Sequence, residues 1–205
     1  MPPRGLGTAL LSEALRDGVT YTSLTPSLMS RQVFKLMGFP ALSEPLLLMP
    51  PLLHADTLRN RIPMIICDPV SVRPLLHETQ RRVFDDHAPY CLQLLVREGD
   101  DQAFIVVRRR MMLLPKIGQL LRATIRMPCS DVLYCSNPHL LARHLERVKL
   151  AILRRQRTVL LAAYAGLFPE RPRGPTRTDV AFYRSSLFAA GEMDRLYSEF
   201  VLLPL

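Results

Sequence analysis

The chain has 205 residues, of which 48% are hydrophobic and 22% are charged, so it is long enough to bury one large core or two small ones. This composition excludes a disordered chain. Eighteen prolines against nine glycines indicate short segments joined by stiff turns, and they disfavour a coiled coil or a simple helical bundle. The sequence therefore predicts a globular protein.

The formal net charge is +9, because 27 lysines and arginines outnumber 18 acidic residues. Such a charge attracts a polyanionic partner or an anionic ligand. Only 7% of the residues are aromatic and the basic residues are spread along the chain, so the aromatic and basic interleaving of single-strand binders is missing. The pattern disfavours nucleic acid as a partner.

The longest apolar stretches, PLLLMPPLL and TVLLAAYAGLF, are too short or too interrupted by proline for a membrane-spanning helix, which takes about 20 apolar residues. No apolar core of a signal peptide follows the first residues. The four cysteines, Cys67, Cys91, Cys129 and Cys135, lack the paired close spacing of a zinc site. We therefore expect a soluble cytoplasmic protein without membrane contact or bound metal, whose thiols are reduced and mostly buried.

Four elements are predicted in the first quarter of the chain from apolar periodicity, β-branched residues and turn residues. In chain order they are a helix over about 6–17, a strand over 19–24, a helix over about 28–37 and one or two proline-interrupted edge strands over 39–53. Thr25 or Ser27 can cap the second helix, and Gly38 ends it. Residues 54–63 are polar and form a connection.

The remaining residues repeat the alternation of strands and helices without aligned sequence identity. In chain order we predict a helix over 73–87, an antiparallel hairpin around Gly99, strands over 122–127 and 131–135, a helix over 138–156, a buried strand over 158–168, a basic loop over 169–179, a short helix over 190–200 and a closing strand over 201–205. This order favours a mixed α/β fold, with helices on both faces of a central sheet, in two lobes at 1–53 and 64–205.

The residues Arg4, Gly5, Leu6, Gly7, Thr8 and Ala9 fit the pattern Arg/Gln-x-x-Gly-x-Gly/Ala. This stretch resembles the acyl-CoA-binding motif of the GNAT superfamily of N-acyltransferases. In such a motif, backbone N–H groups and the positive end of a helix dipole face the CoA pyrophosphate, and small residues let the phosphates approach the backbone. The resemblance implies acetyl-CoA or another acyl-CoA as cosubstrate, held by residues 4–9. The alternative is a plain helix start that contains two glycines.

The residues that follow extend the resemblance over 4–39. The family places a strand and then a helix ending in Gly-Phe after the motif, and VTYTSLTPSLMSRQVFKLMGF supplies both, with Gly38-Phe39 at the end. Residues 64–205 are similar in element order to a second GNAT-like lobe but lack the glycine motif. A whole GNAT domain also has strands before the motif, including one whose splayed edge holds the pantetheine arm. We expect a longer chain, the second lobe or a partner such as a second copy to supply them.

The resemblance does not assign the catalytic residues. The family often carries a tyrosine four residues before the glycine of Gly-Phe, which acts as general acid toward the departing thiolate, and this chain has Phe34 there. Tyr183 and Tyr197 are the hydroxyl donors that could replace it if the second lobe completes the site. Tyr197 ranks first, because its predicted helix corresponds in order to the one that carries Phe34.

Several other polar groups invite a functional interpretation, each beside a simpler one. Asp85, Asp86 and His87 suit a solvated helix end as well as acid-base chemistry. His139 and His144 are five residues apart, so they lie on different helix faces and do not suit a metal. The basic stretches at 108–112 and 153–157 suit a phosphate partner, or a solvated strand end and a helix C-terminus.

The function that the resemblance implies is transfer of an acetyl or other short acyl group from CoA to an amine on a small molecule or a protein. One alternative is a catalytically silent GNAT-like module that binds CoA or a protein partner. Another is a basic α/β protein associated with nucleic acid. The acceptor and the acyl chain length stay open at this point.

Overall fold

The structure is a computed structural model that describes residues 13, 15, 18–23, 27–51, 62–113, 126–170, 172 and 174–187. The chain divides into two compact units. Unit 1 is Met1–Glu44 with Thr178–Asp194, and unit 2 is Pro45–Arg177 with Arg195–Leu205. The expected lobe limits at 53 and 64 stay a prediction, because most of the connection between them lies outside the described residues.

Unit 1 pairs strands from the two ends of the sequence. Its described elements are β1 (Tyr21–Ser23), α2 (Leu28–Leu36), the first residues of β2 (Ala41–Met49) and most of β8 (Thr176–Arg184). β1 runs antiparallel to β8, with Tyr21 opposite Arg184. Within the same segment of β8, the Tyr183 N–H donates to the Pro40 carbonyl at 3.2 Å. A strand from the second lobe region therefore supplies a neighbour for the first predicted strand.

The helix of unit 1 begins and ends at the residues that the sequence indicates. Ser27 is the N-cap of α2, and its hydroxyl accepts a hydrogen bond from the Ser30 N–H at 3.1 Å. Gly38 follows the helix with a φ of +72°, a left-handed conformation that favours glycine. The predicted strand over 19–24 and helix over 28–37 are confirmed, whereas the helix predicted over 6–17 falls almost entirely outside the described residues.

Unit 2 is built on a mixed sheet with the strand order β2, β7, β6, β5, β4, β3. Its further strands are β3 (Met64–Ile66), β4 (Leu92–Glu98), β5 (Asp101–Leu113), β6 (Arg126–Cys135) and β7 (Leu160–Tyr164). Neighbouring strands run antiparallel except β6 and β7, which run parallel. The predicted hairpin is confirmed, because Glu98 faces Asp101 across a turn that contains Gly99 with a φ of +61°.

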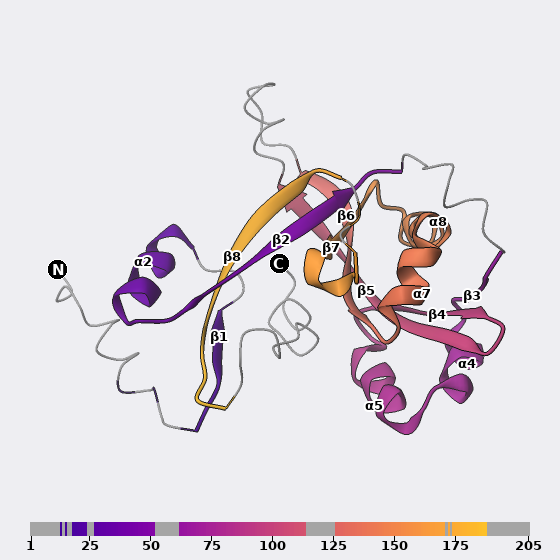
Figure 1. The fold of residues 1–205 in the computed structure, drawn as a ribbon, viewed down its shortest axis with the longest axis horizontal. Coiled ribbons are helices and arrows are strands. Elements are labelled where there is room, and N and C mark those ends of the chain that lie inside the picture. The colour runs from indigo at the N-terminus through magenta and orange to yellow at the C-terminus, as the bar shows by residue number, and fades with distance from the viewer. Residues whose placement is uncertain are drawn as a thin grey trace. The chain divides into compact units, whose positions relative to one another are not determined.

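Helices cover both faces of this sheet, as predicted (Figure 1). They are α4 (Pro69–Val72), a 3-10 turn (Arg73–Leu75), α5 (Glu78–His87), α7 (Pro138–Arg143), α8 (Leu145–Gln156) and a second 3-10 turn (Ala165–Leu167). Because neighbouring residues of a strand point to opposite faces, Leu94 packs in the core beneath α7 and α8, and Leu95 in the core beneath α4 and α5. Mixed α/β architecture is thus established.

Four predictions for unit 2 need correction. β6 is one strand through Pro128, since proline's φ suits an extended chain. The helix over 138–156 is broken at His144, whose φ of −112° and ψ of 19° are not helical. The segment 73–87 likewise divides, because Leu76 is extended. β2 is no edge strand, since Leu46–Met49 pairs with β7 and the Leu48 N–H donates to the Pro175 carbonyl at 2.9 Å.

The last part of the chain is only partly described. β8 begins at Thr176, inside the predicted basic loop, whereas the buried strand at 158–168 is confirmed as β7 over Leu160–Tyr164. The elements predicted over 190–200 and 201–205 lie outside the described residues. Within the residues that the structure describes, no helix is both long and apolar enough to cross a membrane.

Candidate functional site

The residues expected to bind CoA, Arg4 to Ala9, lie outside the described residues, and so does the candidate general acid Tyr197. Phe34, at the position of the family's tyrosine, is on α2. Its ring packs against the rings of Phe39 and Phe182, with centroid distances of 5.1 and 5.6 Å. Phe34 is thus part of an aromatic cluster and offers no proton. Tyr183 is half-buried on β8.

The pairing between the two parallel strands of unit 2 ends before β6 does. β6 and β7 are in register from Cys129 opposite Leu160 to Val132 opposite Ala163. Leu133 is an extra residue in β6, because its neighbours Val132 and Tyr134 face consecutive residues of β5. Beyond that bulge β6 continues to Cys135 without a β7 partner among the described residues, whereas β7 turns away into a 3-10 turn.

The helix that follows β6 begins with few available N–H donors. The Asn137 side chain accepts a hydrogen bond from the Leu140 N–H at 3.1 Å, and Pro138 has no N–H. Ser136 is also engaged, because its N–H donates to the Phe104 carbonyl and its hydroxyl accepts from the Phe104 N–H. A phosphate group needs several such donors at a helix start. This end of α7 is therefore poorly suited to bind the CoA pyrophosphate.

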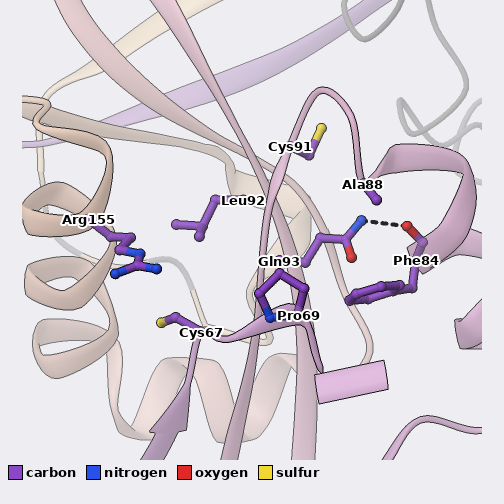
Figure 2. Close-up of a pocket in the computed structure, with 8 residues that line it drawn as sticks. All are labelled: Cys67, Pro69, Phe84, Ala88, Cys91, Leu92, Gln93 and Arg155. Atoms are coloured by element: carbon purple, nitrogen blue, oxygen red, sulfur yellow. Dashed lines mark hydrogen bonds between the residues drawn. The ribbon is translucent and has the colours of Figure 1, made fainter. Parts of the chain in front are cut away.

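A small pocket opens where β3 ends and β4 continues (Figure 2). It is lined by Cys67, Pro69, Phe84, Ala88, Cys91, Leu92, Gln93 and Arg155. Gln93 Nε2 donates to the Phe84 carbonyl at 2.7 Å, and the amide oxygen of Gln93 is buried without a hydrogen-bond partner in the described structure. The volume is about 140 Å³, below the roughly 300–1,000 Å³ of sites that enclose drug-sized ligands. The pocket is too small for an acyl-CoA.

The two thiols of this pocket are not set up as nucleophiles. Burial raises the pKa of Cys91 to about 11, against a smaller opposing effect of Arg108. Burial also raises the pKa of Cys67, although Arg155 lowers it in part. Because the thiolate is the reactive form, both groups are protonated and unreactive near neutral pH. All four cysteines are free thiols, as expected, but only Cys129 and Cys135 are buried, whereas Cys67 and Cys91 are half-buried.

The remaining polar residues that the sequence highlights are separated. Asp85 forms an ion pair with Arg73, whose Nε lies 2.8 Å from Asp85 Oδ1. His87 is buried, and its Nδ1 lies within hydrogen-bond distance of the Val83 carbonyl oxygen, at 2.8 Å. His139 is exposed, whereas His144 is buried. No group of three or more histidines, cysteines or acidic residues that could hold a metal ion occurs in the described part of the chain.

One carboxylate joins the hairpin of unit 2 to the junction between α7 and α8. Glu98 Oε2 lies 2.8 Å from Arg143 Nη1 and 3.1 Å from Nε2 of His144, whose side chain is fully buried. The pKa of Glu98 lies below its ordinary value. The hydrogen bond from Arg143 is the main cause, and the hydrogen bond from His144 is the second. Glu98 therefore contributes to stability in its ionised form.

This contact predicts a pH-dependent effect of Glu98→Gln. A carboxyl with a depressed pKa in the folded state contributes stability that is complete above its unfolded pKa, about 4.3, and is lost as the pH falls through its folded pKa. We expect the variant to be less stable than the wild type at pH 6–7, and the difference to shrink below pH 4. Urea unfolding over this pH range, with exposed Glu170→Gln as control, measures it. A difference that stays constant with pH would contradict the assignment.

Two features of unit 2 are absent from the sequence-based site. Gln93 is a polar residue within the apolar run LQLLV, and this interruption is a signal for a buried hydrogen bond. The ion pair of Arg110 with buried Asp131, at 3.0 Å, has no comparable signal, because the partners are on different strands. Neither the Gln93 hydrogen bond nor the Arg110–Asp131 ion pair provides a set of catalytic side chains.

No family model, curated protein or solved structure matches the chain.

Proposed function

We propose that the chain is an acyl-CoA-dependent N-acyltransferase of the GNAT type, with one acyl-CoA site at residues 4–9. The observation that carries this proposal is the order of elements after the motif. β1 and α2 follow it, and the helix ends at Gly38-Phe39 with Gly38 in the left-handed conformation. That is the order in which the family places a strand, a helix and a Gly-Phe turn.

Unit 2 supports the same proposal through its topology. Antiparallel strands β3 to β6 are followed by α7 and α8, and then by β7 parallel to β6. The pairing of β6 with β7 ends at Val132, next to a bulge in β6. A splayed strand pair before a helix is the feature that the GNAT resemblance implies for the pantetheine arm. Because Asn137 and Pro138 leave few donors for a pyrophosphate, we assign no acyl-CoA to this lobe.

In the proposed reaction, the acceptor amine attacks the thioester carbonyl, the carbon–sulfur bond breaks, and the acyl group becomes an amide. Backbone N–H groups of residues 4–9 hold the pyrophosphate and position the thioester. The amine nitrogen loses one proton to water, and the departing thiolate takes one, for which Tyr197 is the candidate donor. The acceptor is an amine on a small molecule or a protein.

The second candidate is a silent module that binds CoA without turnover. The packing of Phe34 against Phe39 and Phe182 favours it, because this contact gives the ring a structural role at the family's acid position. Both candidates predict acyl-CoA binding. Only the first predicts release of free CoA in the presence of an amine.

Gly7→Glu tests the binding site directly. A glutamate side chain at the motif brings bulk and negative charge to the place of the pyrophosphate, so we expect acetyl-CoA to stabilise the wild type and not the variant. At 100 times the dissociation constant, a ligand adds about 2.7 kcal/mol, which raises the melting temperature by several degrees. Thermal unfolding with and without acetyl-CoA measures the effect.

Gly174→Glu is the matched control for this experiment, because it adds the same side chain at an exposed glycine. A Cβ there would meet the Leu48 carbonyl oxygen at 3.6 Å, an ordinary contact. The control should keep the full stabilisation by acetyl-CoA. No stabilisation of a folded wild type would refute the acyl-CoA site. Thiol release with a panel of amines then separates the enzyme from the silent module, and Tyr197→Phe should slow it if Tyr197 is the acid.

A further inference from the structure

Two arginine-rich segments that are far apart in the sequence meet at one end of unit 2, which we call the basic end. Its members are Arg109 on β5, Arg126 at the start of β6, and Arg154, Arg155 and Arg157 at the end of α8. All five are exposed. The sequence alone shows them only as separate basic stretches.

Hydrogen bonds between α8 and the sheet fix this arrangement. Gln156 Nε2 donates to the Val107 carbonyl at 3.2 Å, and the Ser130 hydroxyl lies 2.6 Å from Gln156 Oε1 and 2.5 Å from the Thr158 hydroxyl. Arg109 is opposite Ser130 in the antiparallel register. Val107 belongs to the core beneath α7 and α8. Arg109 is two residues farther along the strand, so it lies on the same face of the sheet, just beyond the end of α8.

The charge of the basic end is not balanced by the described residues near it. No ion pair within 4 Å is formed by any of its five arginines there. Hydrogen bonds from Ser71 are the main cause that lowers the pKa of Asp68, and the charge of Arg155 adds a smaller effect in the same direction. The acidic turn of the hairpin, at 98–101, is roughly 27 Å or more along β5 from Arg109, at about 3.4 Å per residue. The helix C-terminus offsets only about half a charge.

We propose that the basic end binds the phosphate backbone of double-stranded nucleic acid without base specificity. Guanidinium groups bind phosphate oxygens in pairs, and several together give sequence-independent affinity. The exposed apolar residues beside them, Met111, Leu113 and Val159, carry no aromatic ring on which an unpaired base could stack. The fold thus gathers basic residues that are dispersed in the sequence, and this surface is independent of the proposed acyl-CoA site.

The double variant Arg109→Gln/Arg154→Gln tests this surface. Fluorescence anisotropy with labelled 20-base-pair DNA and RNA duplexes, repeated over a salt series, gives the slope of log K against log salt. Each neutralised phosphate contributes about −0.9 to the slope on DNA, so we expect the double variant to bind more weakly with a slope shallower by about 2. The control Arg82→Gln/Arg184→Gln removes two exposed arginines elsewhere and should keep the wild-type slope.

Three results would overturn the proposal. The first is equal weakening by both double variants, which would mean that net charge alone attracts the duplex. The second is no duplex binding by the wild type at low salt. The third is binding of another polyanion through the same arginines while neither duplex binds. Binding of phosphatidylserine vesicles would assign the basic end to a lipid surface, and binding of polyglutamate would assign it to an acidic protein. Circular dichroism of each variant confirms that it is folded.

Discussion

Phe104→Ala is expected to destabilise unit 2 by about 3–5 kcal/mol, the usual cost when a buried phenylalanine is truncated and a cavity remains. The Phe104 side chain is fully buried on β5. Its ring lies 6.3 Å from the ring of Phe84 on α5 and 6.1 Å from that of Tyr134 on β6, so it joins a helix to the sheet. Removing it takes away contacts on both sides.

Chemical unfolding followed by circular dichroism measures this free energy. Phe104→Leu keeps much of the volume and should cost considerably less. Leu113→Ala removes an apolar side chain that is 47% exposed, and it should change stability by well under 1 kcal/mol. If Phe104→Ala lowered the free energy of unfolding no more than Leu113→Ala, the described packing of Phe104 between α5 and the sheet would be contradicted.

Asp131→Asn is expected to cost about 3 kcal/mol, because it removes the carboxylate that faces a largely buried guanidinium. Asp131 Oδ2 lies 3.0 Å from Arg110 Nε, and the side chains are only 4% and 17% exposed. A carboxamide has almost the same shape but no charge, so the loss is electrostatic and not steric. Chemical unfolding measures the change.

Asp85→Asn is the matched control, because Asp85 forms a 2.8 Å ion pair with Arg73 in which both side chains are about half exposed. Solvent screens such a pair, so a much smaller change is expected. Replacing Asp131 and Arg110 together by apolar residues of similar size should restore stability in part, because no buried charge is then left without its partner. Equal effects of Asp131→Asn and Asp85→Asn would contradict the buried pair.

The sequence predicts those parts of the fold that depend on local chemistry. The sequence predicts a helix with Thr25 or Ser27 as its cap and Gly38 at its end, and Ser27 and Gly38 bound it through a side-chain cap and a left-handed φ. The sequence also predicts a hairpin turn around Gly99, and β4 and β5 pair on either side of that residue. These signals lie within a few residues of the element that they determine.

Long-range pairing could not be predicted in the same way. Nothing in the residues of β8 indicates that Tyr183 and Arg184 pair beside β1, about 160 residues earlier in the chain. The break at His144 is likewise a tertiary effect, since Glu98 from a distant hairpin contacts that side chain. Of the candidate site, Phe34 is located in an aromatic cluster, whereas residues 4–9 and Tyr197 stay predictions.

We propose one acyl-CoA site per chain, at residues 4–9 and not at the start of α7. Calorimetric titration of the purified protein with acetyl-CoA tests this site, because it gives affinity and stoichiometry together. We expect one acetyl-CoA per chain for the wild type and none for Gly7→Glu. No heat of binding with the folded wild type, a stoichiometry of two, or unchanged binding by Gly7→Glu would contradict the claim.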